Sequence, residues 1–364
     1  MWKRFSNPLL IAVLLTVHSV RSVLAEPPTL DTEASKLGIA FHRYTTKDNL
    51  GRTISFYLSA IPVKEPTSKL PIVLFIQGSG CQSLWQKHGD RVGGGMQNLL
   101  LVEAKGKARI LVVEKPGVKF LDQPQNPGSA IGASEEFLQE HTLPRWAEAN
   151  CAALRAAWAL PNIDTTRTLV SGHSEGGIVA ARVAAELPQV THVASLAAGG
   201  PTQLFDFITN AAKARPDDKP GDAAQRLQRF YDDWARIQKD PDSTSRMWMG
   251  HPNRRWSSFL RDSVIEELQR SKARIYLGQG VLDPIIPVAS HDMAVAELRS
   301  KGRDVVSDRV EGADHGFQTA DMPKQGPPKG MQDLFGRLLK WFLVEEGTSP
   351  GSNTGGPAPS LAKD

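Results

Sequence analysis

The sequence predicts an α/β fold with a mostly parallel, doubly wound sheet of eight strands. Short apolar segments alternate with segments of helical composition along most of the 364 residues. Two of these segments, 71–77 and 109–114, contain continuous apolar runs, which are typical of strands buried on both faces of a parallel sheet. A third begins at Thr168, ends in a glycine-flanked turn and passes directly into an Ala/Val-rich helical segment.

The composition is that of an ordinary globular protein, with 40% hydrophobic and 23% charged residues. The formal net charge is +4, but residues 1–25 carry three basic residues and no acidic one, so their removal would leave +1. Because no basic face is clustered in the sequence, neither nucleic acid nor an acidic membrane surface is expected as a partner.

The N-terminus predicts a secretory signal peptide over residues 1–25. Lys3 and Arg4 precede the apolar run 9–15, and Val23-Leu24-Ala25 supplies the small residues of a cleavage site before Glu26. The apolar run is too short to span a bilayer comfortably, and no later segment is long and apolar enough. We therefore expect an exported protein, periplasmic or secreted, with no membrane contact after removal of the signal.

Residues 26–346 are expected to form one domain, followed by a disordered Gly/Ser/Pro-rich tail at 347–364. An irregular segment at 26–36 precedes an antiparallel edge hairpin and a loop at 62–70. The expected strands are 39–45, 53–61, 71–77, 109–114, one beginning at Thr168, 190–197, 273–277 and 304–310. The expected helices are 96–104, 144–160, 178–187, 290–300 and 331–344. The triple glycine 93–95 has no Lys-Ser/Thr after it, so we interpret it as a loop and not as a phosphate-binding turn.

Segment 203–271 differs in composition from the rest of the chain. It is charged, rich in tryptophan and helical in character, and it contains no segment typical of a core strand. We interpret it as a helical insertion over the sheet.

The most informative motif is Gly172-His173-Ser174-Glu175-Gly176, between the strand at Thr168 and the following helix. It matches the Gly-x-Ser-x-Gly nucleophile elbow, a strained turn that exposes the serine hydroxyl. Glycines are needed in such a turn because neighbouring backbone leaves no room for a Cβ. Ser174 also lies at a helix N-terminus, where the N–H of Glu175 can face a developing oxyanion.

A serine hydroxyl becomes a good nucleophile only when a base accepts its proton and a third group orients that base. In open α/β sheets such groups collect at the carboxyl ends of the strands. Ser174, Asp283 and His315 each follow a strand, in the chain order expected for an elbow serine. Other residues compete for the base and acid roles: His173, His251, His291, Asp206, Asp308 and Asp314. We favour His315 because it follows the final strand, whereas His173 should point away from the nucleophile.

With these residues the chain resembles the α/β-hydrolase superfamily over approximately residues 39–344. The resemblance implies an α/β-hydrolase fold in which Ser174 is the nucleophile, His315 the general base and acid, and Asp283 the orienting carboxylate. It also implies that segment 203–271 is a lid and that the N–H groups of Ser79 and Glu175 form the oxyanion hole. Gln77 departs from the pattern, since many members carry histidine there, but the function of that loop is carried by the main chain.

Several remaining side chains are interpreted as structural. We expect Glu175 to make a salt bridge or water contact, the Trp234, Trp248 and Trp256 rings to pack in the insertion, and Arg254-Arg255 to form a solvated face. The histidines are scattered and no His-Glu-x-x-His occurs, so no metal or cofactor is expected. Cys81 and Cys151 can pair in an oxidising compartment, although distant thiols are as often simply buried.

The sequence favours hydrolysis of a carboxylic ester, because that reaction needs only the triad, the oxyanion hole and water. An exported serine peptidase is the first alternative. It would need an anchor for a peptide N-terminus, such as Asp232-Asp233 or Glu266-Glu267. A binding scaffold without activity is a further alternative, which the intact set of three residues disfavours. The sequence does not define the oligomeric state.

Overall fold

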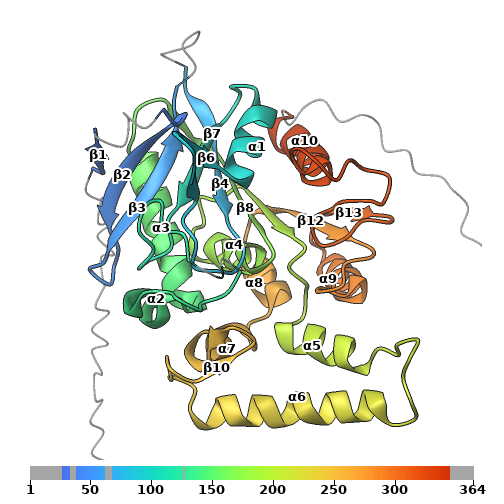
Figure 1. Ribbon diagram of the computed structural model, residues 1–364. Coiled ribbons are helices and arrows are strands. Elements are labelled where there is room, and N and C mark those ends of the chain that lie inside the picture. The colour runs from blue at the N-terminus through green and yellow to red at the C-terminus, as the bar shows by residue number, and fades with distance from the viewer. Residues whose placement is uncertain (1–26, 33–37, 62–67, 125, 127, 345–364) are drawn as a thin grey trace, which may run out of the picture.

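The computed structural model describes residues 27–32, 38–61, 68–124, 126 and 128–344, so the expected signal peptide and C-terminal tail lie outside the described residues. A nine-stranded sheet crosses the molecule, with helices on both of its faces (Figure 1). This is the α/β-hydrolase fold that the sequence predicted, since six consecutive strands of the sheet are parallel and follow the order β7-β4-β8-β9-β12-β13.

The remaining strands of this sheet, β1 to β3, are antiparallel and pair with β7 through β3. The strands, in sheet order, are β1 (Thr29–Asp31), β2 (Phe41–Lys47), β3 (Thr53–Ser59), β7 (Arg109–Val113), β4 (Leu70–Ile76), β8 (Ile163–His173), β9 (His192–Leu196), β12 (Arg274–Gly280) and β13 (Val305–Val310). Two two-stranded ribbons lie apart from the sheet: β5 (Trp85–His88) with β6 (Arg91–Gly94), and β10 (Met247–Trp248) with β11 (His251–Pro252).

The structure corrects three details of the predicted strands. The sheet has nine strands because Thr29–Asp31, within the segment expected to be irregular, pairs with Arg43–Thr45 of β2. Strand β8 begins at Ile163 and not at Thr168, with a register shift opposite Pro71 and Ile72. Gly93 and Gly94, interpreted as loop, belong to β6, where they pair with Gln86 and Trp85.

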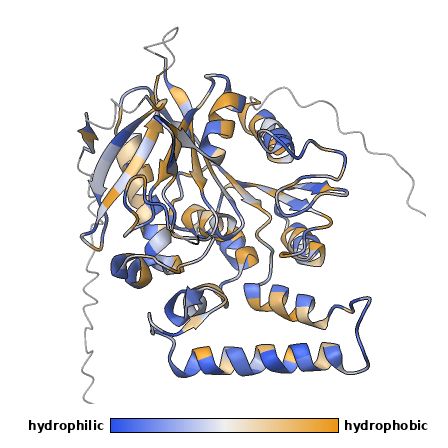
Figure 2. Cartoon of the chain, viewed as in Figure 1, coloured by the Kyte–Doolittle hydropathy of each residue, from blue (hydrophilic) through white to orange (hydrophobic). Residues whose placement is uncertain are grey.

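The helices lie on both faces of the sheet and in segment 203–271. They are α1 (Met96–Ala104), α2 (Glu135–Glu140), α3 (Leu143–Trp158), α4 (Glu175–Glu186), α5 (Gln203–Ala212), α6 (Asp222–Lys239), α7 (Asn253–Phe259), α8 (Val264–Arg270), α9 (Val288–Ser300) and α10 (Lys329–Leu343). Buried side chains of α1 and α10 share one core cluster with the sheet, whereas those of α3, α4, α8 and α9 share the other. The central strands are predominantly hydrophobic (Figure 2), as strands buried on both faces should be.

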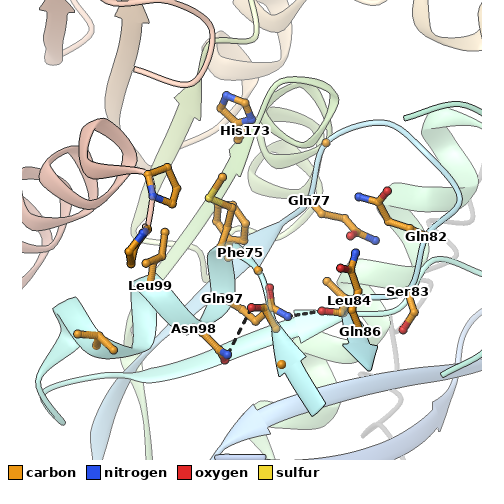
Figure 3. Close-up of a pocket in the computed structure, with 18 of the residues that line it drawn as sticks. Phe75, Gln77, Gln82, Ser83, Leu84, Gln86, Gln97, Asn98, Leu99 and His173 are labelled. Atoms are coloured by element: carbon orange, nitrogen blue, oxygen red, sulfur yellow. Dashed lines mark hydrogen bonds between the residues drawn. The ribbon is translucent and has the colours of Figure 1, made fainter. Parts of the chain in front are cut away.

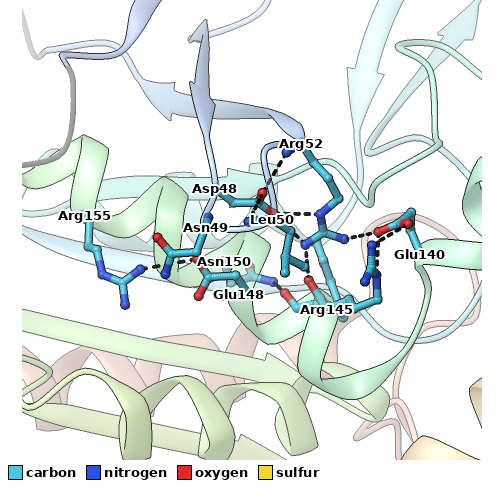
Figure 4. A network of polar contacts seen from close by, with 10 residues as sticks. Asp48, Asn49, Leu50, Arg52, Glu140, Arg145, Glu148, Asn150 and Arg155 are labelled. Carbon is cyan, nitrogen blue, oxygen red and sulfur yellow. Dashed lines mark hydrogen bonds and ion pairs between the residues drawn. The ribbon is translucent and has the colours of Figure 1, made fainter. Parts of the chain in front are cut away.

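A network of charged side chains fixes the β2–β3 hairpin to α2 and α3 (Figure 4). The Arg52 guanidinium donates hydrogen bonds to Asp48 within the turn at 2.7 Å and to Glu140 at 2.6 Å. It also donates to the carbonyl of Arg145 at 2.6 Å, and the Arg145 side chain in turn binds Glu140 at 2.7 Å. Because one guanidinium contacts three partners, it fixes the position of the β2–β3 hairpin relative to α2 and α3.

Segment 203–271 contains α5 to α8 and the β10–β11 ribbon, and α5, α6 and α7 are set off from the sheet (Figure 1). Its own small core comprises Ile237, Trp256 and Leu260, with Trp234 and Trp248 packed against them. Helix α6 is mostly hydrophilic (Figure 2) and buries only Phe230 and Ile237, so one narrow stripe attaches it. No helix within the described residues is both long and apolar enough to cross a membrane.

Candidate active site

Ser174 lies at the turn between β8 and α4 with φ of 56° and ψ of −126°, a backbone conformation rare for a residue with a side chain. A Cβ built on Gly172 would lie 2.0 Å from the carbonyl oxygen of Gly176, and one on Gly176 would lie 2.1 Å from that of Ile76. Both positions therefore require glycine, as the motif predicted. The turn places Ser174 immediately before the N-terminus of α4, where the serine is only partly exposed to solvent.

His315 and Asp283 meet beyond the ends of β13 and β12. His315 Nδ1 donates a hydrogen bond of 2.7 Å to Asp283 Oδ2. The other carboxylate oxygen accepts hydrogen bonds from the amides of Ile285 and Ile286 at 2.8 and 3.0 Å. Burial alone would raise the pKa of Asp283, but the hydrogen bonds from His315 and from these amides hold it below its usual value. A charged Asp283 fixes the His315 tautomer, which leaves Nε2 as the proton acceptor.

Two neighbouring residues hold the segment that carries His315. His173 Nε2 donates a hydrogen bond of 2.8 Å to the His315 carbonyl. Burial lowers the pKa of His173 to about 4, so its ring is neutral near pH 7. Asp314 Oδ1 accepts hydrogen bonds from the amides of Gly316 and Gln318 at 2.8 and 3.0 Å, which agrees with the interpretation that Asp314 fixes the loop. The described chain shows no hydrogen bond between Ser174 Oγ and His315, a contact that often tightens only when substrate binds.

The competing residues have other partners. Asp206, in the first turn of α5, is buried, and burial raises its pKa to about 7, with the nearby charge of Asp283 acting in the same direction. It is Asp283, and not Asp206, that binds His315. His291 lies on α9 and binds Ser307 Oγ at 2.9 Å. His251 is buried in the insertion against the ring of Trp256.

The amides of Ser79 and Glu175 are both available for an incoming oxyanion. Neither donates a hydrogen bond to another described residue. A Cβ built on Gly78 would lie 3.5 Å from the Cβ of Ser174, so the loop that carries Ser79 runs directly beside the nucleophile. The Glu175 amide is the first N–H of α4, where intrahelical partners are lacking and the helix dipole favours negative charge.

The Glu175 carboxylate lies at the centre of a buried ion cluster that sequence reasoning did not resolve. It accepts hydrogen bonds from Lys115 Nζ at 3.1 Å, from His141 Nε2 at 2.8 Å and from Arg255 Nη2 at 2.8 Å. Burial alone would raise the pKa of Glu175, but these three partners hold it well below its usual range. Burial lowers the pKa of His141 to about 4, so this ring is neutral near pH 7. The expected structural role of the Glu175 side chain is therefore observed.

Arg255 corrects the interpretation of Arg254-Arg255 as a solvated face. The residue is 2% exposed, and its guanidinium lies 4.0 Å from the ring centroid of Trp256 in addition to its contact with Glu175. Arg254, in contrast, reaches Asp242 at the surface. The only signal in the sequence was Glu175 itself, because an acid in a buried turn needs a cation and the sequence does not say which one.

Lys115 connects the two expected oxyanion donors. This fully buried ammonium donates hydrogen bonds to the carbonyls of Gly78 at 2.7 Å and Gly80 at 3.0 Å, which flank Ser79. The same ammonium binds the Glu175 side chain. One side chain thus contacts both the loop that carries Ser79 and the side chain of Glu175.

Cys81 and Cys151 are both free and buried, so the disulfide considered from the sequence is not formed. They belong to different core clusters, Cys81 beside Phe137 and Cys151 on α3. The Cys151 thiol, with Glu148 and Glu186, places three potential ligand atoms within 4.8 Å of one another. Both carboxylates of this group already pair with arginines, Arg155 and Arg182.

Comparisons with solved structures support the fold. The chain is similar to an acylaminoacyl peptidase from Pyrococcus horikoshii, with a TM-score of 0.56 and 15% identity over 87% of this chain and 44% of that one. It is also similar to acetyl xylan esterase 1 from Thermoanaerobacterium, with a TM-score of 0.51 and 16% identity over 88% and 89% of the two chains. A third similar structure is Est1E from Butyrivibrio proteoclasticus, with a TM-score of 0.50 and 13% identity over 84% and 97%. No protein-family model and no curated protein sequence matches this chain.

The chain spans less than half the length of the peptidase it matches, whereas it spans nearly the whole length of the two esterases. All three are α/β-hydrolase-fold serine hydrolases. At these identities the comparisons show the fold of this chain, which is that of the α/β-hydrolases.

Proposed function

We propose that this protein is a serine hydrolase that cleaves a carboxylic ester through an acyl-enzyme formed on Ser174. The observation that carries the proposal is the Ser174 elbow at the same edge of the sheet as the hydrogen-bonded His315–Asp283 pair. A strained serine, a histidine oriented by a charged aspartate and two unpaired amides make up the chemistry that acyl transfer requires.

In the proposed mechanism, Ser174 Oγ attacks the ester carbonyl carbon while its proton passes to His315 Nε2. The amides of Ser79 and Glu175 donate hydrogen bonds to the oxyanion of the tetrahedral intermediate. The bond to the alcohol oxygen breaks, and the alcohol takes the proton from His315. Water then attacks the acyl-enzyme and gives a proton to His315, the bond to Oγ breaks, and the proton returns to Ser174.

Two of the four acids considered as an anchor for a peptide N-terminus, Asp233 and Glu267, already have partners, which favours an ester over a peptide. Asp233 accepts hydrogen bonds from Arg236 and from Trp248, and Glu267 is paired with Arg182 and Arg270. Asp233 and Glu267 are therefore not available to bind a peptide N-terminus. Asp232 binds Gln228 on the exposed side of α6.

The proposal includes export, which depends on the signal-like residues 1–25. It also includes a covering role for segment 203–271, which stays a prediction.

The decisive experiment is covalent labelling of the purified mature protein by a fluorophosphonate, with intact mass as the readout and Ser174→Ala as the control. We expect a single adduct on the wild-type protein and none on the variant. p-Nitrophenyl esters compared with aminoacyl and prolyl anilides then separate an esterase from a peptidase. A folded protein that forms no adduct would contradict the proposal and favour a binding scaffold.

A further inference from the structure

A cavity of about 630 Å³ is lined by the loop that carries Ser79 and by the N-terminal part of α1 (Figure 3). It is lined by residues 77–79, by parts of the β5–β6 ribbon, by the first turns of α1 and by Pro327-Pro328. Its volume is within the range of small-molecule sites. Gly78 and Ser79 line the cavity, whereas Ser174 and His315 do not. Because Gly78 lies directly against Ser174, a ligand in the cavity would contact the loop that runs beside the proposed nucleophile.

The cavity has no strongly charged lining. None of the described residues that line it is Asp, Glu, Lys or Arg. Two histidines also line it: His173, which is neutral near pH 7 because burial lowers its pKa to about 4, and the exposed His88 at the end of β5. A charged group entering here would lose hydration without meeting a counter-charge, and that loss is costly. The cavity therefore selects an uncharged ligand.

The polar side chains of the cavity are mostly carboxamides. Those that make no hydrogen bond within the described protein are available to bind a ligand. Gln97 and Asn98 are occupied, because their amide nitrogens donate to the carbonyls of Leu84 and Gly94 at 2.6 and 3.4 Å. Gln77 Nε2 is buried and has no hydrogen-bond partner among the described residues. Figure 3 shows Gln82 and Gln86 on the same side of the cavity as Gln77.

Gln82 and Gln86 are half-buried, and neither side chain makes a hydrogen bond to another described residue. A carboxamide both donates and accepts hydrogen bonds, as an alcohol hydroxyl does. Three adjacent unused carboxamides thus match a ligand that carries several hydroxyl groups. Apolar side chains, including Phe75, Met96 and Leu99, complete the lining and suit the C–H faces of a ring.

We propose that this cavity binds an uncharged, hydroxyl-rich ring, a glycosyl unit, as the alcohol part of the ester substrate. This inference rests on the proposed function and specifies its substrate class. The bond that breaks joins the acyl carbon to a sugar hydroxyl oxygen, and that oxygen takes its proton from His315.

Three acetates with the same acyl group test the inference: a mono-O-acetyl methyl glucopyranoside, cyclohexyl acetate and acetylcholine. The first two share a six-membered ring and differ in ring hydroxyls, and the third adds a positive charge. We expect kcat/KM for the glucopyranoside to exceed that for either other ester by at least about ten-fold. Equal or higher kcat/KM for cyclohexyl acetate or acetylcholine would overturn the inference.

The double variant Gln82→Leu/Gln86→Leu should lower the glucopyranoside-to-cyclohexyl ratio of kcat/KM by about ten-fold. Lys87→Leu is the matched control, because Lys87 lies between Gln86 and His88 but does not line the cavity. An unchanged ratio in the double variant would argue against the cavity as the binding site.

Fluorophosphonate labelling of Ser174 separates this inference from the proposed function. Labelling without a preference for the glucopyranoside would overturn only the inference. If no label forms, calorimetric titration of the Ser174→Ala protein with methyl glucopyranoside still tests the cavity. Binding that the double variant abolishes would support it, and absence of binding would overturn it.

Discussion

Arg255 Nη2, in the helical insertion, donates a hydrogen bond of 2.8 Å to Glu175 Oε2, the side chain directly after Ser174. The two residues are 80 positions apart in the sequence. The backbone amide of Glu175 is a proposed oxyanion donor, and its side chain is held by the insertion. The insertion is therefore hydrogen-bonded to the residue that follows Ser174, and a displacement of α7 would move Glu175.

Arg255→Leu should lower both stability and activity. It leaves Glu175 buried without the guanidinium that donates two hydrogen bonds to its Oε2, and breaking a buried pair in this way typically costs roughly 3–5 kcal/mol. We expect a lower urea midpoint and a drop in kcat for a p-nitrophenyl ester, measured under conditions where the variant is folded. Arg254→Leu, which removes only surface contacts, is the control. Equal effects of the two substitutions would refute this role of Arg255.

Lys115→Met should weaken binding of the transition state more than binding of the substrate. The substitution removes the hydrogen bonds to the carbonyls of Gly78 and Gly80, so both the Ser79 amide and Glu175 lose their support. Loss of one oxyanion donor costs about 10²–10³ in kcat, and we expect a fall of up to that size with a smaller change in KM.

The affinity of the Lys115→Met variant for a boronic acid that mimics the tetrahedral intermediate should fall in parallel with kcat. The exposed Lys119 provides the control variant Lys119→Met. A change confined to KM, or to stability alone, would show that Lys115 does not position the oxyanion donors.

Asp283→Asn should lower kcat by about 10³–10⁴, because an amide in place of the carboxylate favours the wrong tautomer of His315. Asp314→Asn tests whether any acid near His315 matters, since the Asp314 side chain binds backbone amides and retains an acceptor oxygen in the variant. Steady-state kinetics and the rate of fluorophosphonate labelling measure both variants. Activity retained in Asp283→Asn, with loss in Asp314→Asn, would reverse the assignment.

Asp206→Asn should stabilise the protein increasingly as the pH rises from about 4 to 8. The pKa of Asp206 is about 7 in the folded protein and near 3.8 in a model peptide, so between these values the folded state binds the extra proton. Wild-type stability is then lost as the pH rises through this window, by at most about 4 kcal/mol from this group.

Because the variant has no carboxyl group to ionise, its advantage over the wild type should be small at pH 4 and largest above pH 7. Urea unfolding across this range measures the difference. Asp304→Asn is the control, since the Asp304 side chain is 77% exposed. A stability difference that does not depend on pH would mean that Asp206 ionises normally.

The sequence was sufficient for those parts of the molecule that depend on local patterns. The helix at Met96–Ala104 was predicted with its observed bounds, and the elbow glycines at 172 and 176 have the steric role inferred for them. The mostly parallel sheet followed from the alternation of strands and helices, and Asp283 and His315, each expected just after a strand, are hydrogen-bonded to each other.

Features that depend on distant partners were not accessible from the sequence. Strand β1 is three residues long and exists because it pairs with β2, and Gly93 and Gly94 are extended because Gln86 and Trp85 lie opposite. The burial of Arg255 could not be predicted, because two adjacent arginines give no sign of a carboxylate 80 residues away in the sequence. Long-range pairing is a property of the folded chain and leaves no local signature.

The order of the strands also has a consequence for synthesis of the protein. His315 follows His173 by 142 residues, and its strand β13 pairs only with β12 in the described sheet. A chain emerging from the ribosome therefore presents the Ser174 turn long before it can supply a base for it. We expect ribosome-held chains that stop before His315 not to react with fluorophosphonates. Reactivity of Ser174 should appear only after β13 and His315 have been synthesised and added to the sheet.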